Sequence, residues 1–511
     1  MSEIKSNKSN AVINWLKNTF MPMTKKEIPM TISLGAMMGS IVCLYTILRQ
    51  AKDQLILGLG GASVIPYAKV LVMIVAAILG VQHSKITRKY SHKKAFLISI
   101  IPFIVFFVMF AFLFRYADTL QMRPDTIADL TEKIPFLRYF FLVIGNWMAT
   151  SYYIFAEMFG SFILGVSFWQ LVNFYYSHSQ AKRIYTYFGL WAQIGNYLAG
   201  HIMVHISTIF KETRDINNHV FLVTSAVVFS ASIILASLFY FFNIALKDYN
   251  GENKEKVSTV NTAQKAKVKM HWKESWKQLR DQPALLLTAF LSVWYGLCST
   301  SMEVYWKDKV VDYYGVHGYG IFMGHYQKYT AIISFIMVLI GGVLMRNLPW
   351  IVPALFTPLV VIISSSFLFG IKLPFVKVIL GKILVFSPAA LQDEMLYITV
   401  IIGAAALIVF KAFKYTLFDP TKEMFTRSRT RDEAIQIKSL ETFVSRFGKG
   451  GSSVIQTIIL GMNGMTMDTM SPILWCMIMC MSSIWTYSIV VPLNKEMKLV
   501  ELKAKDQEKI E

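Results

Sequence analysis

Charged residues are scarce in this chain of 511 residues. Asp, Glu, Lys and Arg together make up 16% of it, whereas 55% is hydrophobic, a balance that excludes an ordinary soluble globular protein. The apolar residues fall in long blocks, such as MTISLGAMMGSIVCLYTIL and FLISIIPFIVFFVMFAFLF, which match the roughly 20 residues needed to cross about 30 Å of hydrocarbon. We therefore predict an all-α, polytopic membrane protein.

Catalytic and metal-binding motifs are absent as well. The four cysteines, Cys43, Cys298, Cys476 and Cys480, lie inside apolar blocks, which favours small core side chains over a disulfide or a zinc site. The segment RFGKGGSS lacks the leading glycine of a phosphate-binding loop, and no polar region is large enough for a nucleotide-hydrolysing domain. We predict neither an enzyme nor a pump driven by ATP hydrolysis, and no cofactor or metal.

The formal net charge of +20 does not indicate a nucleic-acid partner. The excess lies in short segments between apolar blocks, as the orientation of a membrane protein requires. Basic segments precede the first block, follow the second and the fourth, and run from 247 to 280, so all of them should lie on the cytoplasmic side. Because the segment before the first span and the segment 247–280 then lie on the same side of the membrane, the first half must have an even number of spans. The long apolar stretch 139–176 therefore counts as one span.

About twelve spans are predicted in two sets of six. The first set lies near 28–48, 63–81, 95–114, 140–163, 184–205 and 221–245, and the second near 285–306, 330–345, 351–370, 396–413, 434–460 and 473–491. The predicted domains are a cytoplasmic N-terminus (1–27), an N-terminal six-helix bundle (28–246), a basic cytoplasmic linker (247–282), a C-terminal six-helix bundle (283–493) and a cytoplasmic tail (494–511).

An internal repeat crosses the predicted linker. The segment LRQAKDQLIL parallels EVYWKDKVV, which aligns Lys52 with Lys307 and Asp53 with Asp308. The segment QAKRIYTYFGLWAQIG parallels DEAIQIKSLETFVSRFG, which aligns Gly195 with Gly448. Two six-helix halves joined by a basic loop are typical of the major facilitator arrangement, whose halves rock around a central site.

Several ionisable residues lie in or beside predicted spans. Such a residue costs roughly 2.5 to 3.5 kcal/mol on insertion, so it marks a candidate functional position. Glu157 lies deep in the fourth span with no charged residue near it in the sequence. Lys52 follows the first span, with Arg49 one turn before it, and Glu303 lies late in the seventh. For Lys52 and Glu303, a local ion pair with a neighbouring charged residue is an open alternative.

The most charged passage that adjoins a span is KYTLFDPTKEMFTRSRTRDEAIQIK, which contains Lys422. Part of it is expected to form a cytoplasmic loop between the tenth and eleventh spans, and Asp419 is a candidate site residue together with Lys422. Lys438, Arg446 and Lys449 then recur at helical spacing in the eleventh span. That helix face should look into a wet cavity or bind an anion.

These positions suit a polyanionic cargo with a flat ring. Lysine and arginine donate charge-assisted hydrogen bonds to phosphate oxygens. The aromatic residues Trp147, Tyr153 and Trp169 could stack on a base, with ordinary packing against lipid or core as the alternative interpretation. A nucleotide meets both requirements.

Over nearly its whole length the chain resembles the ATP/ADP translocase (nucleotide transporter) family of intracellular bacteria and plastids, which has a major-facilitator-like architecture. The resemblance rests on LRQAKD, AEMFGS, AKRIYTYFG, MEVYWKDK, KYTLFDPTKEM and RFGKGGSSVIQ. It implies that Lys52, Glu157, Glu303 and Lys422 are important for nucleotide transport. Many members carry a basic residue at the position of Asn146, which is a departure in this chain.

The expected function is ATP/ADP exchange by alternating access across the inner membrane of a bacterium, with both termini in the cytoplasm. The expected partners are the nucleotide, the lipid bilayer and, as candidate co-substrates, phosphate or protons, and the chain is expected to be a monomer. Two alternatives are a proton-coupled nucleotide carrier and a broad-specificity carrier of triphosphates or of a dinucleotide. A third, from a different class, is a membrane receptor or scaffold without transport.

Overall fold

The computed structural model describes residues 23–176, 178–209, 216–252, 283–370, 388–429, 431–499 and 502. Most of the predicted N-terminus, linker and C-terminal tail lies outside these residues. Within the described ranges all regular structure is helical and no strand occurs, which confirms the predicted fold class.

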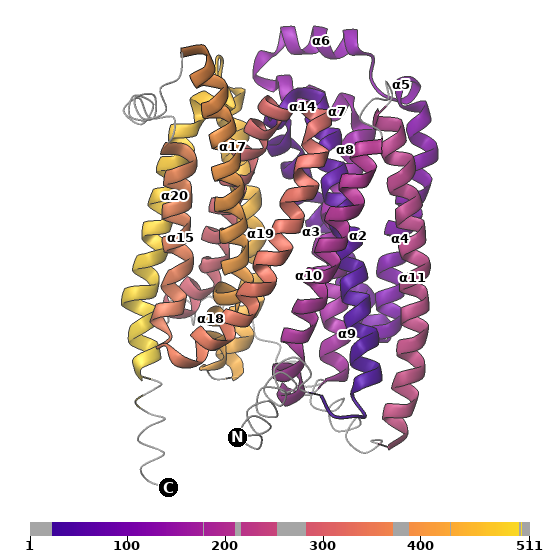
Figure 1. Cartoon of the computed structure of the whole chain (residues 1–511), viewed down its shortest axis with the longest axis vertical. Coiled ribbons are helices and arrows are strands. Elements are labelled where there is room, and N and C mark those ends of the chain that lie inside the picture. The colour runs from indigo at the N-terminus through magenta and orange to yellow at the C-terminus, as the bar shows by residue number, and fades with distance from the viewer. Residues whose placement is uncertain are drawn as a thin grey trace, which may run out of the picture.

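The first helix group comprises the helices between residues 28 and 252 (Figure 1). Its long helices are α2 (Ile28–Gly60), α3 (Ile65–Lys89), α4 (His92–Leu113), α10 (His178–Ile209) and α11 (Ile216–Glu252). Between α4 and α10 the chain forms α5 (Ala117–Leu120), α6 (Pro124–Lys133), α7 (Arg138–Gly145), α8 (Trp147–Phe159), the π-helix η4 (Gly160–Ser167) and α9 (Phe168–Tyr175).

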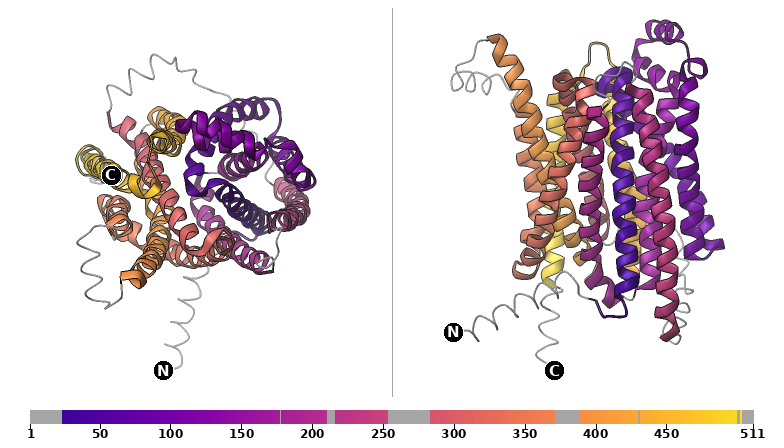
Figure 2. Two further views of the ribbon diagram at one scale, coloured as in Figure 1. Left: turned by 90° about the horizontal axis from the view of Figure 1, so that it is seen from above. Right: turned by 45° about the vertical axis from the view of Figure 1, so that its right-hand side comes forward.

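The second helix group comprises the helices between residues 283 and 499, and it lies beside the first (Figure 2). Its members are α14 (Pro283–Asn347), α15 (Ile351–Gly370), α17 (Pro388–Phe413), the π-helix η5 (Lys414–Phe418), α18 (Asp419–Arg427), α19 (Arg431–Gly461), α20 (Met467–Ser488) and the π-helix η6 (Ile489–Leu493). Within α14 the backbone turns sharply at Gly315, whose φ of 68° favours glycine, so α14 is two helices.

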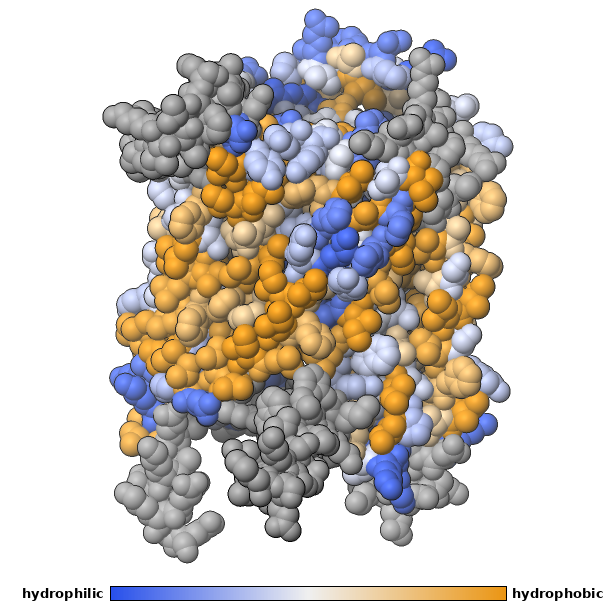
Figure 3. All heavy atoms as spheres, viewed as in Figure 1, coloured by the Kyte–Doolittle hydropathy of each residue, from blue (hydrophilic) through white to orange (hydrophobic). Residues whose placement is uncertain are grey.

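Nine helices in the described residues are long and apolar enough to cross a membrane. One of these nine is α14, which counts as two helices because of the turn at Gly315. The helices α10 and α19 are also long enough to span a membrane but are more polar. The described residues therefore contain twelve long helical segments. An apolar belt covers the face seen in Figure 3. The stretch 139–176 forms one helical path, interrupted at Asn146 and continued through η4 to Tyr175.

Several helices are longer than the sequence predicted. The segments 49–60 and 307–329 were expected to lie between spans, but they continue α2 and α14. The segment around Asp419 was expected to be a loop, but it forms α18 directly after η5, because proline is accepted in the first turn of a helix and an acidic residue there is favourable. Lys52, Asp53 and Lys307, the most deeply buried charged residues in these extensions, are paired, and the pairing permits their burial.

Two close helix crossings occupy corresponding positions in the two groups. A Cβ atom at Gly195 on α10 would lie 2.1 Å from the carbonyl oxygen of Gly39 on α2, and one at Gly448 on α19 would lie 2.5 Å from the carbonyl oxygen of Val293 on α14. Gly195 and Gly448 are the residues that the sequence repeat aligns. The repeated glycine therefore allows the same backbone contact in each group.

The two groups are joined at the upper end in Figure 1, where α2 ends. Arg138 Nη2 donates hydrogen bonds to the carbonyl oxygens of Leu460 (3.2 Å) and Met465 (2.9 Å), and the Tyr67 hydroxyl donates to the carbonyl of Thr457 (3.0 Å). These bonds link α7 and α3 of the first group to the end of α19 and the loop after it. The upper end is therefore closed.

Candidate functional site

The candidate site centres on Asp53, whose carboxylate binds two lysines from different helix groups. Asp53 Oδ1 lies 2.9 Å from Lys52 Nζ on α2, and Asp53 Oδ2 lies 2.7 Å from Lys307 Nζ on α14. All three side chains are at most 3% exposed. Buried ions are tolerated only when they are paired, so these contacts explain how three charged side chains can be buried here. They also link α2 to α14. We call Lys52, Asp53 and Lys307 the central ion group.

Glu303 forms ion pairs with several basic residues just below the central ion group. It lies about one turn before Lys307 on α14, and its carboxylate contacts Arg49 of α2, Lys307 at 3.1 Å and Lys411 of α17 at 3.8 Å. The side chains of Arg49 and Lys411 are 29% and 18% exposed. Solvent therefore reaches this layer, although it does not reach the central ion group.

Glu157 extends the same layer from the first helix group. Its Oε2 lies 3.1 Å from Lys52 Nζ, which also lies 3.8 Å from the centre of the Tyr153 ring. Glu157 lies in the last turn of α8, just before the π-helix η4, and π-helical turns are frequent at functional sites. The π-helix η4 packs closely against α2 at Gly160, where an added Cβ atom would lie 2.1 Å from the ring of Tyr45.

Two further lysines lie near these carboxylates without an ion pair. Lys69 on α3 is within electrostatic range of Glu303, Glu157 and the central ion group, and Lys449 on α19 is within range of Glu157, Arg49 and Glu303. Neither lysine has a carboxylate within 4 Å in the described part of the chain. Lys449 is exposed and Lys69 is half-buried, so both can meet a ligand.

The site carries an excess of positive charge. Six basic side chains, namely Arg49, Lys52, Lys69, Lys307, Lys411 and Lys449, face three carboxylates, Asp53, Glu157 and Glu303, which leaves a formal charge of +3. The exposed members lie on the lower side of the buried central ion group. This arrangement can bind a polyanion on the lower side of the central ion group.

The structure brings together five of the predicted site residues: Arg49, Lys52, Glu157, Glu303 and Lys449. It does not bring Lys422 to them. Lys422 Nζ contacts Glu441 and lies 2.9 Å from Ser292 Oγ, about three turns, or roughly 16 Å, before Glu303 on α14. Asp419 instead binds Lys414, at 3.3 Å, near the lower end.

The remaining predicted residues fall outside the described side chains or outside the site. Lys438 and Arg446 lie on α19, but their side chains are not among those described. Trp147 is 48% exposed and donates its indole N–H to the carbonyl of Leu120, and Trp169 packs against Phe168 and Phe188. Ordinary packing therefore accounts for both tryptophans, whereas Tyr153 lies at the site.

Sequence reasoning missed Lys69 and Lys411. Each lies in an apolar segment, YAKVLV and IVFKAF, so the insertion cost that singled out Glu157 applied to them equally. Lys69 was overlooked because it lies near the start of its predicted span, and Lys411 because it lies near the end of its own. Their convergence on Glu303 depends on how α3 and α17 pack, which no local pattern shows.

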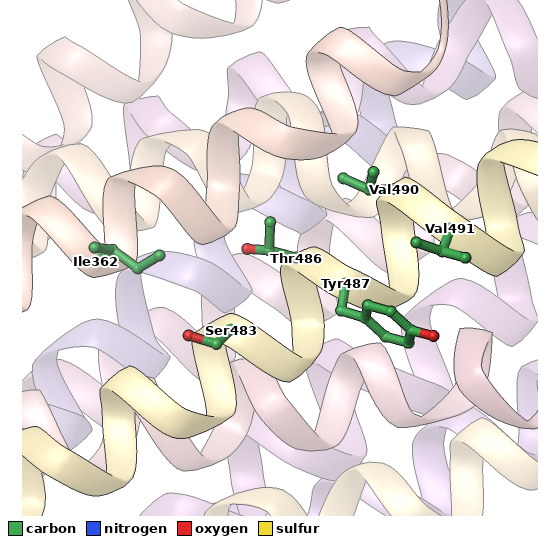
Figure 4. Close-up of a pocket in the computed structure, with 6 residues that line it drawn as sticks. All are labelled: Ile362, Ser483, Thr486, Tyr487, Val490 and Val491. Atoms are coloured by element: carbon green, nitrogen blue, oxygen red, sulfur yellow. The ribbon is translucent and has the colours of Figure 1, made fainter.

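A separate pocket lies on α15, α20 and η6 (Figure 4). It is lined by Ile362, Ser483, Thr486, Tyr487, Val490 and Val491, none of which is a lysine, an arginine or a carboxylate. This mainly apolar lining does not suit a phosphate, and the charged site is the better candidate.

Comparison with known proteins identifies the family. A family model described as "TLC ATP/ADP transporter" matches residues 6–497. The chain is 29% identical over 506 residues to "ADP,ATP carrier protein 1" of Chlamydia pneumoniae, covering 96% of each chain. It is 28% identical to "ADP,ATP carrier protein 4" of Rickettsia conorii, covering 97% of each chain.

Solved structures show the same fold at low sequence identity. A D-xylose–proton symporter matches with a TM-score of 0.54 at 10% identity, covering 90% of this chain and 97% of its own. A bacterial homologue of the iron transporter ferroportin, in an inward-facing state, matches with a TM-score of 0.52 at 10% identity, covering 92% and 100%. These are transporters with the major facilitator fold. By fold and by the match over residues 6–497, the chain belongs to the TLC ATP/ADP transporter family, and it is a multi-pass membrane transporter and not an enzyme.

Proposed function

We propose that this protein exchanges ATP and ADP across the inner membrane of a bacterium by alternating access, with the nucleotide phosphates held by the charged site. The observation that carries the proposal is the excess of basic side chains just below the buried central ion group. Phosphate oxygens are the natural ligands of such a group of lysines and arginines. The names of the full-length relatives support ATP and ADP as the cargo.

The orientation follows from the basic residues at the lower end. Lys85, Lys89, Lys93 and Lys94 lie where α3 ends and α4 begins, and basic segments favour the cytoplasmic side. We propose that the lower end and both termini lie in the cytoplasm, so that the structure is closed to the outside. The segments 28–246 and 283–493 would then act as the two rocking halves.

The charge excess also explains exchange in preference to one-way transport. An empty site with unneutralised lysines is costly to enclose between the two halves, so the empty carrier should reorient slowly. A bound nucleotide cancels the excess and allows the halves to rock. Glu157 and Glu303 hold the basic residues in the empty state and release them on binding, which makes them coupling residues.

A liposome experiment tests this function. Liposomes that hold the protein and labelled ATP should release the label when ADP is added outside, and should retain it in buffer alone. Release by every nucleoside triphosphate would indicate a broad-specificity carrier. Uptake into empty vesicles driven by an acid-outside gradient would indicate proton symport, and no release by any nucleotide would rule out exchange.

Glu157→Gln tests the coupling role. The carboxamide cannot balance the charge of Lys52, so the empty state should lose part of its organisation, and exchange should fall about tenfold or more, as expected for an interaction worth at least 1.4 kcal/mol. The measurement is ATP/ADP exchange in liposomes together with nucleotide affinity. If both quantities equal those of the unmodified protein, Glu157 has no coupling role.

Lys69→Gln tests whether an unpaired lysine binds phosphate. Removing one charge-assisted hydrogen bond, worth roughly 1.5 to 3 kcal/mol, should raise the ADP concentration for half-maximal exchange about tenfold or more. Thermal stability without nucleotide should change little, because no ion pair is broken in the described structure. The control is Lys133→Gln, since Lys133 is exposed on α6 and pairs with the exposed Asp129. Equal half-maximal concentrations in the Lys69 and Lys133 variants would exclude a phosphate contact.

A further inference from the structure

A group of basic side chains lies on the outer surface of the helix bundle where α10 meets α14. Within the apolar belt, Figure 3 shows a hydrophilic area over the junction of these helices. The cluster comprises His201 and His205 on α10 and His325 and Lys328 on α14. His325 is within electrostatic range of both Lys328 and His201, so residues of the two helix groups form one cluster.

The cluster is held in place by close backbone packing. A Cβ atom at Gly200 would lie 2.7 Å from the carbonyl oxygen of Gly324 and 2.7 Å from Cγ of Lys328. The absence of a side chain at Gly200 thus lets the stem of Lys328 cross α10. The ring of His201 packs at 4.8 Å against that of Tyr197.

None of the acidic side chains that the structure describes neutralises this cluster. Lys328 and the three histidines have no carboxylate within 4 Å in the described residues. A lysine at the depth of a span is normally paired or faces a wet interior. Here Lys328 is half-buried beside the exposed His325, so an anion from the surroundings can supply the charge that Lys328 lacks, and the imidazole of His325 can donate a hydrogen bond to it.

The neighbouring side chains suit acyl chains. Below the cluster, α10 exposes Leu198 and Ile194, and α14 exposes Ile332 and Ile336. Both helices therefore become apolar in the direction away from the upper end and toward the middle of the bundle. A phospholipid of the upper leaflet would have its phosphate beside the cluster and its chains along these residues.

We propose that this junction binds an anionic phospholipid, whose phosphate contacts Lys328 and His325 while its acyl chains cover the apolar face below. Because the contacts come from α10 and α14, such a lipid bridges the two helix groups in the state that is closed at the upper end. This site is separate from the nucleotide site and does not depend on the proposed exchange.

Native mass spectrometry of the full-length protein without nucleotide provides the test. The detergent-solubilised protein should retain phosphatidylglycerol over phosphatidylcholine of the same acyl chains. The double variant Lys328→Gln, His325→Gln should reduce this preference about fivefold or more, as the loss of charge-assisted contacts requires. Lys328→Arg should preserve it, and Lys133→Gln should leave it unchanged.

Three results would overturn the proposal. The first is equal retention of phosphatidylglycerol by the double variant in protein that remains folded, shown by an unchanged melting temperature. The second is displacement of the lipid by millimolar inorganic phosphate, which would indicate a site for a free anion. The third is a dimer that the double variant abolishes, which would assign this surface to a second copy of the chain.

Discussion

Replacing Lys52 with glutamine is expected to reduce ATP/ADP exchange by at least about 100-fold. Lys52 contacts Asp53 and Glu157, so its loss leaves two carboxylates at the site with one basic partner fewer. Breaking a buried ion pair by removing one partner typically costs about 3 to 5 kcal/mol, and where the transport-competent arrangement of the site bears this cost, its population falls by a factor of 100 or more. Exchange in liposomes, normalised to the amount of inserted protein, is the measurement.

A second variant separates folding from transport. The double variant Lys52→Gln, Glu157→Gln removes both charges of that pair and leaves Asp53 with Lys307, so it should recover much of the thermal stability lost in Lys52→Gln without recovering exchange. Lys133→Gln provides the matched loss of one positive charge at an exposed position. If Lys52→Gln exchanges within threefold of Lys133→Gln, the central ion group is not part of the transport site.

Gly195→Ala is expected to destabilise the packing of α10 against α2. The new Cβ would lie 2.1 Å from the carbonyl oxygen of Gly39, and this neighbour is backbone that cannot turn aside. The helices α2 and α10 must separate, and overpacking of this kind typically costs about 1 to 3 kcal/mol or more. The melting temperature in detergent should fall by several degrees.

The chain supplies its own control for this prediction. Gly189 lies on the same helix, and a Cβ there would have no neighbour within 4 Å. Gly189→Ala should therefore be neutral or slightly stabilising, because alanine favours the helix by up to about 1 kcal/mol over glycine. Equal melting temperatures for the two variants would show that the crossing of α2 and α10 is looser than described.

The apolar blocks and basic loops were sufficient to predict the fold class. Span lengths and the parity of charge follow from the thickness and polarity of the bilayer, which act on local sequence. Helix ends were predicted less well. The predicted spans end at Leu48 and Trp306, before the charged residues that follow. In the structure these helices continue, because Lys52, Asp53 and Lys307 are buried by pairing with one another across the two groups.

The candidate site was predicted only in part, because local sequence reveals single buried charges but not the residues that they contact. Glu157 stood out because it is a lone carboxylate in an apolar span, and the structure places it against Lys52. The pair of Asp53 with Lys307 joins residues 254 positions apart, so local spacing could not reveal it. The sequence repeat aligned Asp308 with Asp53, but Asp308 binds Lys309 at 2.9 Å instead, so the repeat overstated the symmetry of the site.

The single carboxylate shared by Lys52 and Lys307 has a consequence for the cell. When the upper end opens, Asp53 stays with α2 and Lys307 leaves with α14, so each opening strands a lysine unless an anion arrives to replace the carboxylate. In the proposed exchange, every transport step would therefore require a bound nucleotide, and the number of nucleotides on either side of the membrane would stay constant. Such a carrier would transfer phosphoryl energy across the membrane without a net transfer of adenine.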